Sequence, residues 1–217
     1  PLPGEIIVTD NNSTDQTAAV ARTHGASVVF EAKNQIARAR NAGARRAQGE
    51  YLIFVDADTM ISADLLKQAL NNLREGNCVG GGALVSFDKK TGWAASLIIR
   101  FWQWVSIHCQ LAAGSFVYCL RQAFEEAGGF SEALYAGEEI RLSWALKKWG
   151  KPRRQSFRII TDFPVRTSAR KLDDPARVVL ATLICILFPF SIYFKSLCGY
   201  WYKRDRASDT PAIKTKR

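Results

Sequence analysis

Short apolar segments alternate with helix-forming segments from the start of the chain to Gly76. The predicted strands are Glu5–Thr9, Ala26–Glu31 and Tyr51–Val55. A predicted helix follows each strand, over residues 13–24, 34–48 and 62–74, and a glycine lies just beyond each helix. Strands separated by single helices at such short spacing form a parallel sheet with helices on its faces. The sequence therefore predicts an α/β architecture with a mostly parallel, Rossmann-like sheet.

Capping residues locate two of these helices more closely. Ser13 and Gln16 have the spacing of a capping box, and Ser62 is the expected N-cap of the third helix. Further along the chain, helices are predicted over Trp93–Leu111 and from the glutamates at 138 and 139 to Trp149. Arg100 and other polar residues interrupt the helix that begins at Trp93, so it is a poor membrane span.

Carboxylates follow two of the predicted strands. Asp10 ends the first, and Asp56 and Asp58 come directly after the third. Ligands bind at the carboxyl ends of the strands in open parallel sheets. Two carboxylates two residues apart on extended backbone face the same way and suit Mg²⁺ or Mn²⁺, which bridge to phosphates. The pattern favours a metal site over the alternative, a solvated turn.

Other candidate residues are ambiguous when each is taken alone. Asp10 offers a hydrogen-bond acceptor to a base or a ribose, and Arg40 offers a cation to a phosphate. Glu138 and Glu139 stand at a helix start, which is a suitable place for an ionised general base. Each also has a purely structural explanation. Asp10 suits a polar turn, Arg40 suits the exposed side of a helix, and glutamates are common at helix N-termini.

Taken together, four blocks of sequence narrow the choice of protein class. In chain order they are EIIVTDNNSTD, ARARNAGARRAQGEYLIFVDADT, GSFVYCLRQAFEEAGGF and GEEIRLSWALKKWGK. Together they resemble the family 2 glycosyltransferases, which are inverting sugar-nucleotide enzymes of the GT-A fold. The resemblance covers residues from Gly4 to Lys151. It implies transfer of a sugar from a nucleotide-sugar donor to a hydroxyl of a saccharide or lipid-linked acceptor, with cell-envelope polysaccharide or glycolipid synthesis as one expected setting.

The resemblance also implies roles for individual residues. Asp10 matches the nucleoside contact, Arg40 lies in the block that forms the nucleotide pocket, and Asp56 and Asp58 match the D-x-D motif. Asp58 is then the expected direct ligand of Mn²⁺ or Mg²⁺, and Asp56 contacts both nucleotide and metal. The acidic pair at 138 and 139 stands where the family usually has Glu-Asp.

That pair supplies the expected catalytic base. Glu139 aligns with the family's Asp and ranks first, while Glu138 stays a candidate because Glu has the longer side chain.

One departure from the family concerns the start of the domain. The family normally begins with a strand and an Asn-Glu turn upstream of the DNNSTD-like turn, and this strand is absent from the sequence. We therefore expect residues 1–172 to form an incomplete GT-A-like domain that binds sugar nucleotide poorly and is unstable in isolation. A catalytically impaired scaffold relative is the alternative.

The charge of the chain is concentrated at its end. The formal net charge is +10, yet residues 1–140 carry 12 Lys and Arg against 15 Asp and Glu. Beyond them lie an uncharged run of 17 residues, Val178–Phe194, and a basic tail with Tyr200, Trp201 and Tyr202. We expect residues 173–217 to form an apolar helix and tail at the cytoplasmic face of a membrane, peripheral, re-entrant or as a single span. A buried helix is the alternative.

Two further classes fit the residues less well. A nucleic-acid-binding protein would explain the basic tail, but the tail's aromatic residues cluster beside an apolar run, so no nucleic acid partner is expected. A phosphatase of the haloacid-dehalogenase type needs Thr two residues after the second Asp, whereas Thr59 follows Asp58 directly. The five cysteines form no C-x-x-C pair and fit a reducing compartment without disulfides or zinc.

Overall fold

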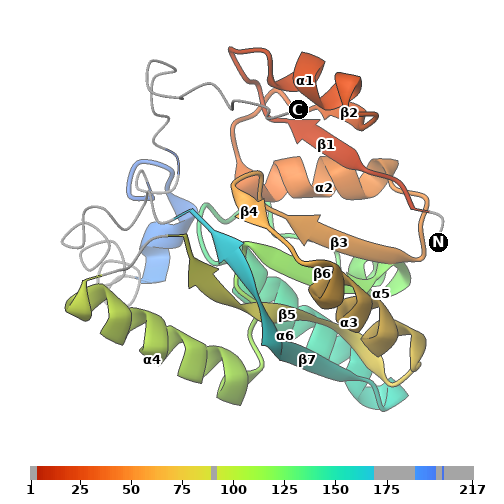
Figure 1. Cartoon of the computed structure of the whole chain (residues 1–217), viewed down its shortest axis with the longest axis vertical. Coiled ribbons are helices and arrows are strands. Elements are labelled where there is room, and N and C mark those ends of the chain that lie inside the picture. The colour runs from red at the N-terminus through yellow and green to blue at the C-terminus, as the bar shows by residue number, and fades with distance from the viewer. Residues whose placement is uncertain (1–3, 89–91, 169–188, 199–201, 203–217) are drawn as a thin grey trace, which may run out of the picture.

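The computed structural model describes residues 4–88, 92–168, 189–198 and 202 (Figure 1). Its strands are β1 (Ile7–Asp10), β2 (Ser27–Phe30), β3 (Tyr51–Val55), β4 (Thr59–Met60), β5 (Cys78–Phe87), β6 (Phe116–Leu120) and β7 (Ser156–Thr167). Its α-helices are α1 (Thr17–Thr23), α2 (Ile36–Arg46), α3 (Ala63–Arg74), α4 (Trp93–Cys109), α5 (Arg121–Glu126) and α6 (Glu138–Gly150). Two short 3₁₀ helices, η1 (Lys151–Arg153) and η3 (Pro189–Tyr193), complete the described elements.

The strands form two sheets. β1 and β2 make a parallel pair, and the other five strands form a mixed sheet in the order β3-β6-β5-β7-β4. β5 and β7 are parallel, whereas β6 runs antiparallel to both of its neighbours and β4 runs antiparallel to β7. The prediction of one mostly parallel sheet is therefore wrong. A short apolar run has the same side-chain pattern in either direction, so its composition does not report how a strand is oriented.

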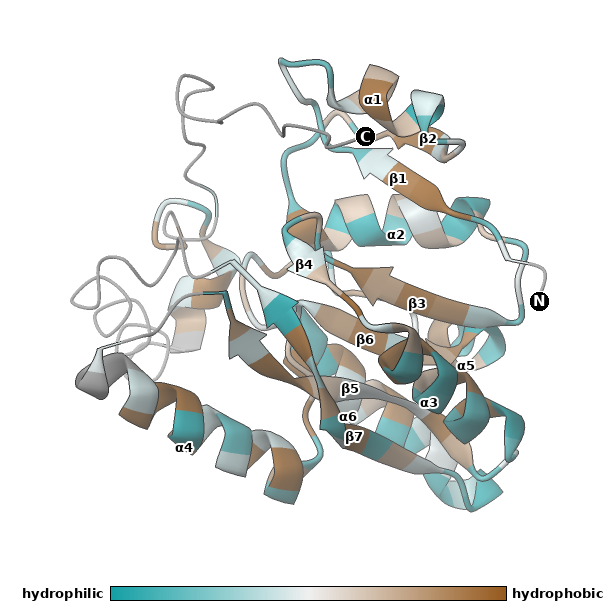
Figure 2. Ribbon diagram, in the orientation of Figure 1, coloured by the Kyte–Doolittle hydropathy of each residue, from teal (hydrophilic) through white to brown (hydrophobic). Residues whose placement is uncertain are grey.

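The five-stranded sheet is covered on both faces. Alternate residues of β6 point to opposite sides: Val117 and Cys119 pack with α5 and α6, and Phe116 and Tyr118 pack with α3. Figure 2 shows hydrophobic residues along β3 and β7 and more hydrophilic ones on α3. β3 and β6 read as continuous apolar runs, as expected of strands covered on both faces.

The strand and helix-cap predictions made from local sequence signals are confirmed only in part. The predicted strand Tyr51–Val55 is confirmed at both ends, and the backbone N–H of Leu65 donates to Ser62 Oγ at 3.1 Å, which confirms the N-cap of α3. The capping box at Ser13 is wrong, since α1 begins at Thr17 and the backbone N–H of Ser13 donates to Asp10 Oδ1 instead. That bond closes a polar turn after β1 and delays the helix.

The predicted C-terminal apolar helix is not shown. Residues 178–188 of the run lie outside the described residues, and Pro189–Tyr193 forms the short 3₁₀ helix η3. A single helix over the whole run is disfavoured at Pro189, because proline has no N–H to donate inside a helix. In the part of the chain that the structure describes, no helix is both long and apolar enough to cross a bilayer. Membrane association of residues 173–217 stays a prediction.

Candidate active site

The largely buried Arg40 of α2 lies at the centre of a cluster of charges. Its Nη2 donates to Asp56 Oδ1 at 2.7 Å and to the carbonyl oxygen of Gly114 at 2.7 Å, and its Nη1 donates to Glu138 Oε1 at 3.0 Å. Only 11% of the Arg40 side chain is exposed. Hydrogen bonds between charged groups are stronger than neutral ones, and burial strengthens them further. The cluster therefore joins four segments that are far apart in the sequence.

Backbone contacts place the partners of Arg40. The N–H of Asp56 donates to the carbonyl oxygen of Ser115 at 3.3 Å, which ties the end of β3 to the segment before β6. A Cβ on Gly114 would lie 3.2 Å from Arg40 Nη2 and 3.5 Å from Glu139 Cδ. Glycine at this position therefore leaves room for the guanidinium and the carboxylate to come together.

The two glutamates at the start of α6 occupy different environments. Glu138 is buried and paired with Arg40, whereas Glu139 is partly buried and forms no ion pair within the described residues. Burial, and next the charge of Glu138, raise the pKa of Glu139 to about 7, and Arg40 only partly offsets them. An acid with a pKa near neutrality is suited to exchange protons with a substrate at physiological pH.

The same charges act on the guanidinium. Burial disfavours a charged Arg40, but the carboxylates of Asp56, Glu138 and Glu139 outweigh burial and raise the pKa of Arg40. Arg40 therefore stays cationic and balances part of a cluster that holds three carboxylates.

Asp10 is positioned separately, at the end of β1. Its side chain is nearly buried, and Oδ1 accepts the backbone N–H of Ser13 at 2.9 Å. Asn11 fixes the same turn, since its Nδ2 donates to the carbonyl oxygens of Glu31 and Lys33 and its Oδ1 accepts the N–H of Gln35. Among the described residues, no hydrogen bond or ion pair joins Asp10 to the Arg40 cluster.

The D-x-D residues differ in what their carboxylates do. The carboxylate of Asp56 binds Arg40. Asp58 is exposed, and its backbone carbonyl oxygen accepts the N–H of Ser168 at 3.3 Å. In the described ranges, no group of three or more His, Cys, Asp or Glu side chains is arranged to hold a metal ion. The oxygen donors of Asp58 and Asp56 nevertheless have the chemistry that Mg²⁺ and Mn²⁺ prefer.

Sequence reasoning missed the residues that hold the loop before α6. Gln35 is fully buried, and its Nε2 donates to the carbonyl oxygens of Glu132 and Leu134. Asn41 exchanges hydrogen bonds with the backbone of Phe130 and donates to Glu132 Oε1. The only sequence signal is that polar residues recur on one side of an alanine-rich helix, which is also typical of a solvated face.

The fold is that of GT-A-like glycosyltransferases. The mannosyltransferase PcManGT from Pyrobaculum calidifontis, in complex with GDP-Man and Mn²⁺, superposes with a TM-score of 0.62 at 20% identity over 91% of this chain and 59% of that one. TarS of S. aureus (residues 1–349, with UDP-GlcNAc) gives a TM-score of 0.56 at 17% identity over 76% and 49% of the two chains. At these identities the likeness shows the fold alone.

Sequence comparison identifies the family. Residues 2–128 match the profile of glycosyl transferase family 2, so the chain belongs to this family and the predicted resemblance is confirmed. An uncharacterized glycosyltransferase of Mycobacterium tuberculosis is 34% identical over 106 residues, which are 49% of this chain and 44% of that protein. One of Haemophilus influenzae is 33% identical over 81 residues, 35% and 32% of the two chains. The matched segment thus spans less than half the length of these relatives.

Proposed function

We propose that the protein transfers a sugar from a nucleotide-sugar donor to an acceptor hydroxyl, with inversion at the anomeric carbon. The observation that carries this proposal is the cluster in which Arg40 joins Asp56 of the D-x-D motif to Glu138, beside Glu139. It brings the expected donor-binding segment and the expected base into one site. Structures with this fold include one in complex with GDP-Man and one with UDP-GlcNAc, which supports a nucleotide sugar as the donor class.

Glu139 is the catalytic base in this proposal. Its carboxylate takes the proton of the acceptor hydroxyl while the hydroxyl oxygen forms a bond to the anomeric carbon. The bond from that carbon to the nucleoside diphosphate breaks, and the electron pair leaves with the diphosphate. The pKa of Glu139 near 7 supports this role, because a base with that value is half ionised at neutral pH and still accepts a proton readily.

Glu138 and Arg40 hold this geometry. Glu138 is buried against the guanidinium, so its carboxylate is less available to an acceptor than that of Glu139. Three acceptors already engage the Nη atoms of Arg40. We therefore assign Arg40 a positioning role between D-x-D and base, in place of the phosphate contact expected from its sequence block.

A divalent cation is part of the proposed site. Asp58, with Asp56 beside it, would hold Mn²⁺ or Mg²⁺, because its exposed carboxylate is free to meet a cation that also binds the donor diphosphate. When bound, the cation neutralises negative charge on the leaving diphosphate. The PcManGT structure in complex with Mn²⁺ supports this assignment.

The acceptor and the cellular site are extensions of the proposal. The uncharged run Val178–Phe194 and the basic tail favour association of residues 173–217 with the cytoplasmic face of a membrane, and hence a saccharide or lipid-linked acceptor of the cell envelope.

Thermal shift measurements on a panel of nucleotide sugars, with and without Mn²⁺, test the proposal as a whole. We expect one or a few donors to raise the melting temperature, and Mn²⁺ to be required for the full shift. No stabilisation by any donor, together with no release of nucleoside diphosphate, would favour the impaired scaffold relative.

A further inference from the structure

Helix α4 turns an aromatic and apolar face to the solvent. Leu97, Phe101 and Trp104 are 59%, 64% and 55% exposed, and their spacing of four and three residues places them on one side of the helix. The rings of Phe101 and Trp104 stack at 6.3 Å, and those of Trp104 and His108 stack at 4.6 Å. These residues, together with the exposed Arg100, are called the α4 surface below.

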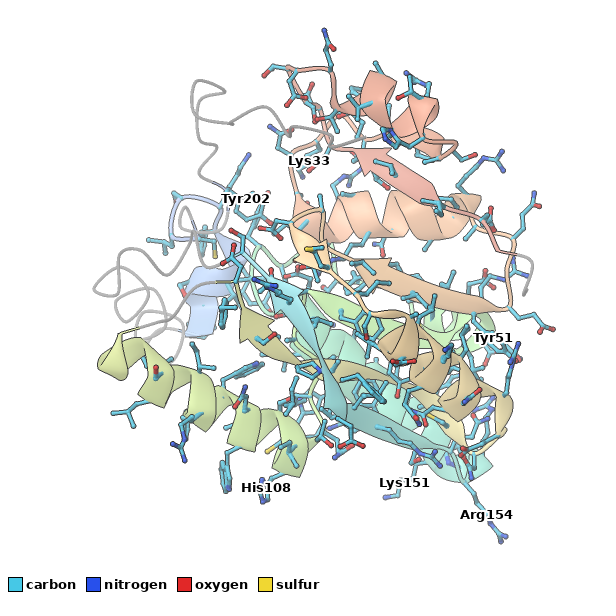
Figure 3. The ribbon with its side chains drawn as sticks, viewed as in Figure 1. Lys33, Tyr51, His108, Lys151, Arg154 and Tyr202 are labelled. Atoms are coloured by element: carbon cyan, nitrogen blue, oxygen red, sulfur yellow. The ribbon has the colours of Figure 1, made fainter. Side chains whose placement is uncertain are left out.

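The opposite side of α4 attaches the helix to the body. Gln103 Nε2 donates to the carbonyl oxygen of Val85 in β5, and the buried Ser106 donates through Oγ to the carbonyl oxygen of Leu111. Figure 1 shows α4 at the margin of the molecule, and Figure 3 shows His108 pointing away from the sheet. The α4 surface is therefore not needed for packing, and exposed apolar patches of this kind mark interaction sites.

Helix α4 itself carries no carboxylate. Arg100 is the only Lys, Arg, Asp or Glu residue between positions 92 and 109. At the end of α4, Lys147 of α6 donates through Nζ to the carbonyl oxygen of Cys109 at 2.7 Å and lies 4.2 Å from the ring centre of the exposed Trp144. Aromatic rings interleaved with cations suit the headgroup region of a bilayer that contains anionic lipids.

We propose that the α4 surface docks on an anionic lipid bilayer, with its rings among the headgroups and Arg100 beside lipid phosphates. A second copy of the chain fits less well, since a symmetric contact through this face would bring the Arg100 side chains of both copies together. α4 is a different segment of the chain from residues 173–217, on which the predicted membrane association depends.

α4 is continuous in sequence with the candidate site. It leads into Ala112, whose N–H donates to Ser143 Oγ in α6, and into Gly114, whose carbonyl oxygen accepts from Arg40.

Vesicle sedimentation with the full chain tests the proposal. We expect the protein to bind phosphatidylcholine vesicles that contain about one third phosphatidylglycerol, and to bind pure phosphatidylcholine vesicles several-fold less. The variant Leu97→Ser/Phe101→Ser/Trp104→Ser should bind the anionic vesicles at least about tenfold more weakly, since three apolar contacts with lipid are lost. The matched variant Ile6→Ser/Val20→Ser/Phe30→Ser, which removes exposed apolar residues elsewhere, should bind like the wild type.

Several results would overturn the proposal. They are the absence of vesicle binding by the wild type, equal binding by the α4 variant, and a concentration-dependent dimer in analytical ultracentrifugation that the α4 variant abolishes. Arg100→Glu keeps the apolar face and should still weaken binding to the anionic vesicles several-fold, so it serves where the triple variant does not fold. Donor hydrolysis, assayed in parallel without lipid, should be unchanged in the α4 variant. If no protein hydrolyses donor while the vesicle results hold, only the proposed function fails.

Discussion

Arg40 and Glu138 form a buried ion pair, 3.0 Å from Nη1 to Oε1, that ties α2 to the first turn of α6. The same guanidinium holds Asp56 after β3 at 2.7 Å. One side chain thus sets the distance between the D-x-D motif and the acidic pair, and the assigned roles can be separated by changing its partners one at a time.

Arg40→Gln should destabilise the fold as well as the site. The change leaves Glu138 buried without its counter-charge, which costs about 3 kcal/mol of unfolding free energy. Denaturant unfolding measures the loss. Arg45→Gln on the same helix is the matched control, because Arg45 is exposed and its ion pair with Glu132 is long, at 3.8 Å. Its unfolding free energy should stay within about 0.5 kcal/mol of wild type. Adding Glu138→Gln to Arg40→Gln should restore part of the stability. A double variant that loses as much unfolding free energy as the two single variants together would contradict the pairing.

The raised pKa of Glu139 predicts a pH-dependent penalty on folding. The ordinary value of 4.5 applies to the unfolded chain and about 7 to the folded one, so the folded protein holds the extra proton between these pH values. The free energy of unfolding therefore falls as the pH rises through this window. Glu139→Gln removes the penalty and should be about 3 kcal/mol more stable than wild type near pH 8, with the difference vanishing near pH 4. Glu125→Gln, an exposed change, should show no such dependence, and a pH-independent effect of Glu139→Gln would refute the burial argument.

Asp58 should govern the response to metal. In Asp58→Ala, added Mn²⁺ should no longer stimulate donor hydrolysis, because the exposed carboxylate that would hold the cation is gone. The control Asp64→Ala removes an exposed carboxylate of α3 and should keep the stimulation. Stimulation of Asp58→Ala equal to that of wild type would remove Asp58 from the metal site.

The β1–β2 pair should be the least stable part of the described sheets. Two strands alone bury little and are marginal in water, whereas β5 and β6 are paired on both sides and buried on both faces. Amide hydrogen exchange should be at least about tenfold faster in Val8 and Val29 than in Val117 and Cys119. Equal protection would contradict this ranking. Because Asp10 ends β1, donor binding should slow exchange in the β1–β2 pair. The same samples also test the expectation that the chain binds donor weakly.

Sequence reasoning succeeded where a signal is local. Tyr51–Val55 is apolar throughout and is followed by carboxylates, so both the strand and the acidic turn after it were predictable. The start of α6 at the two glutamates was predictable for the same reason. The direction of β6 was not, because only its hydrogen-bonded neighbours determine whether it runs parallel or antiparallel.

The structure brings Arg40, Asp56 and the acidic pair together, and this arrangement could not be predicted from the sequence. Glu138 and Glu139 are identical in type and adjacent. In the structure they differ in burial and in the ion pair of Glu138 with Arg40, which lies 98 residues away. Gly114 carries no functional group, and its value comes from the space it leaves beside Arg40 and Glu139. Contacts between distant segments are needed for both distinctions.

The rate of donor hydrolysis as a function of pH tests the central claim that Glu139 is the base. In wild type, kcat/KM should rise with pH through an inflection near 7, as the carboxylate of Glu139 loses its proton. Glu139→Gln should lower kcat/KM at least about 100-fold and remove the inflection, while Glu125→Gln changes neither. Glu139→Gln that retains most of the wild-type rate, or an inflection that persists in it, would show that another group takes the proton.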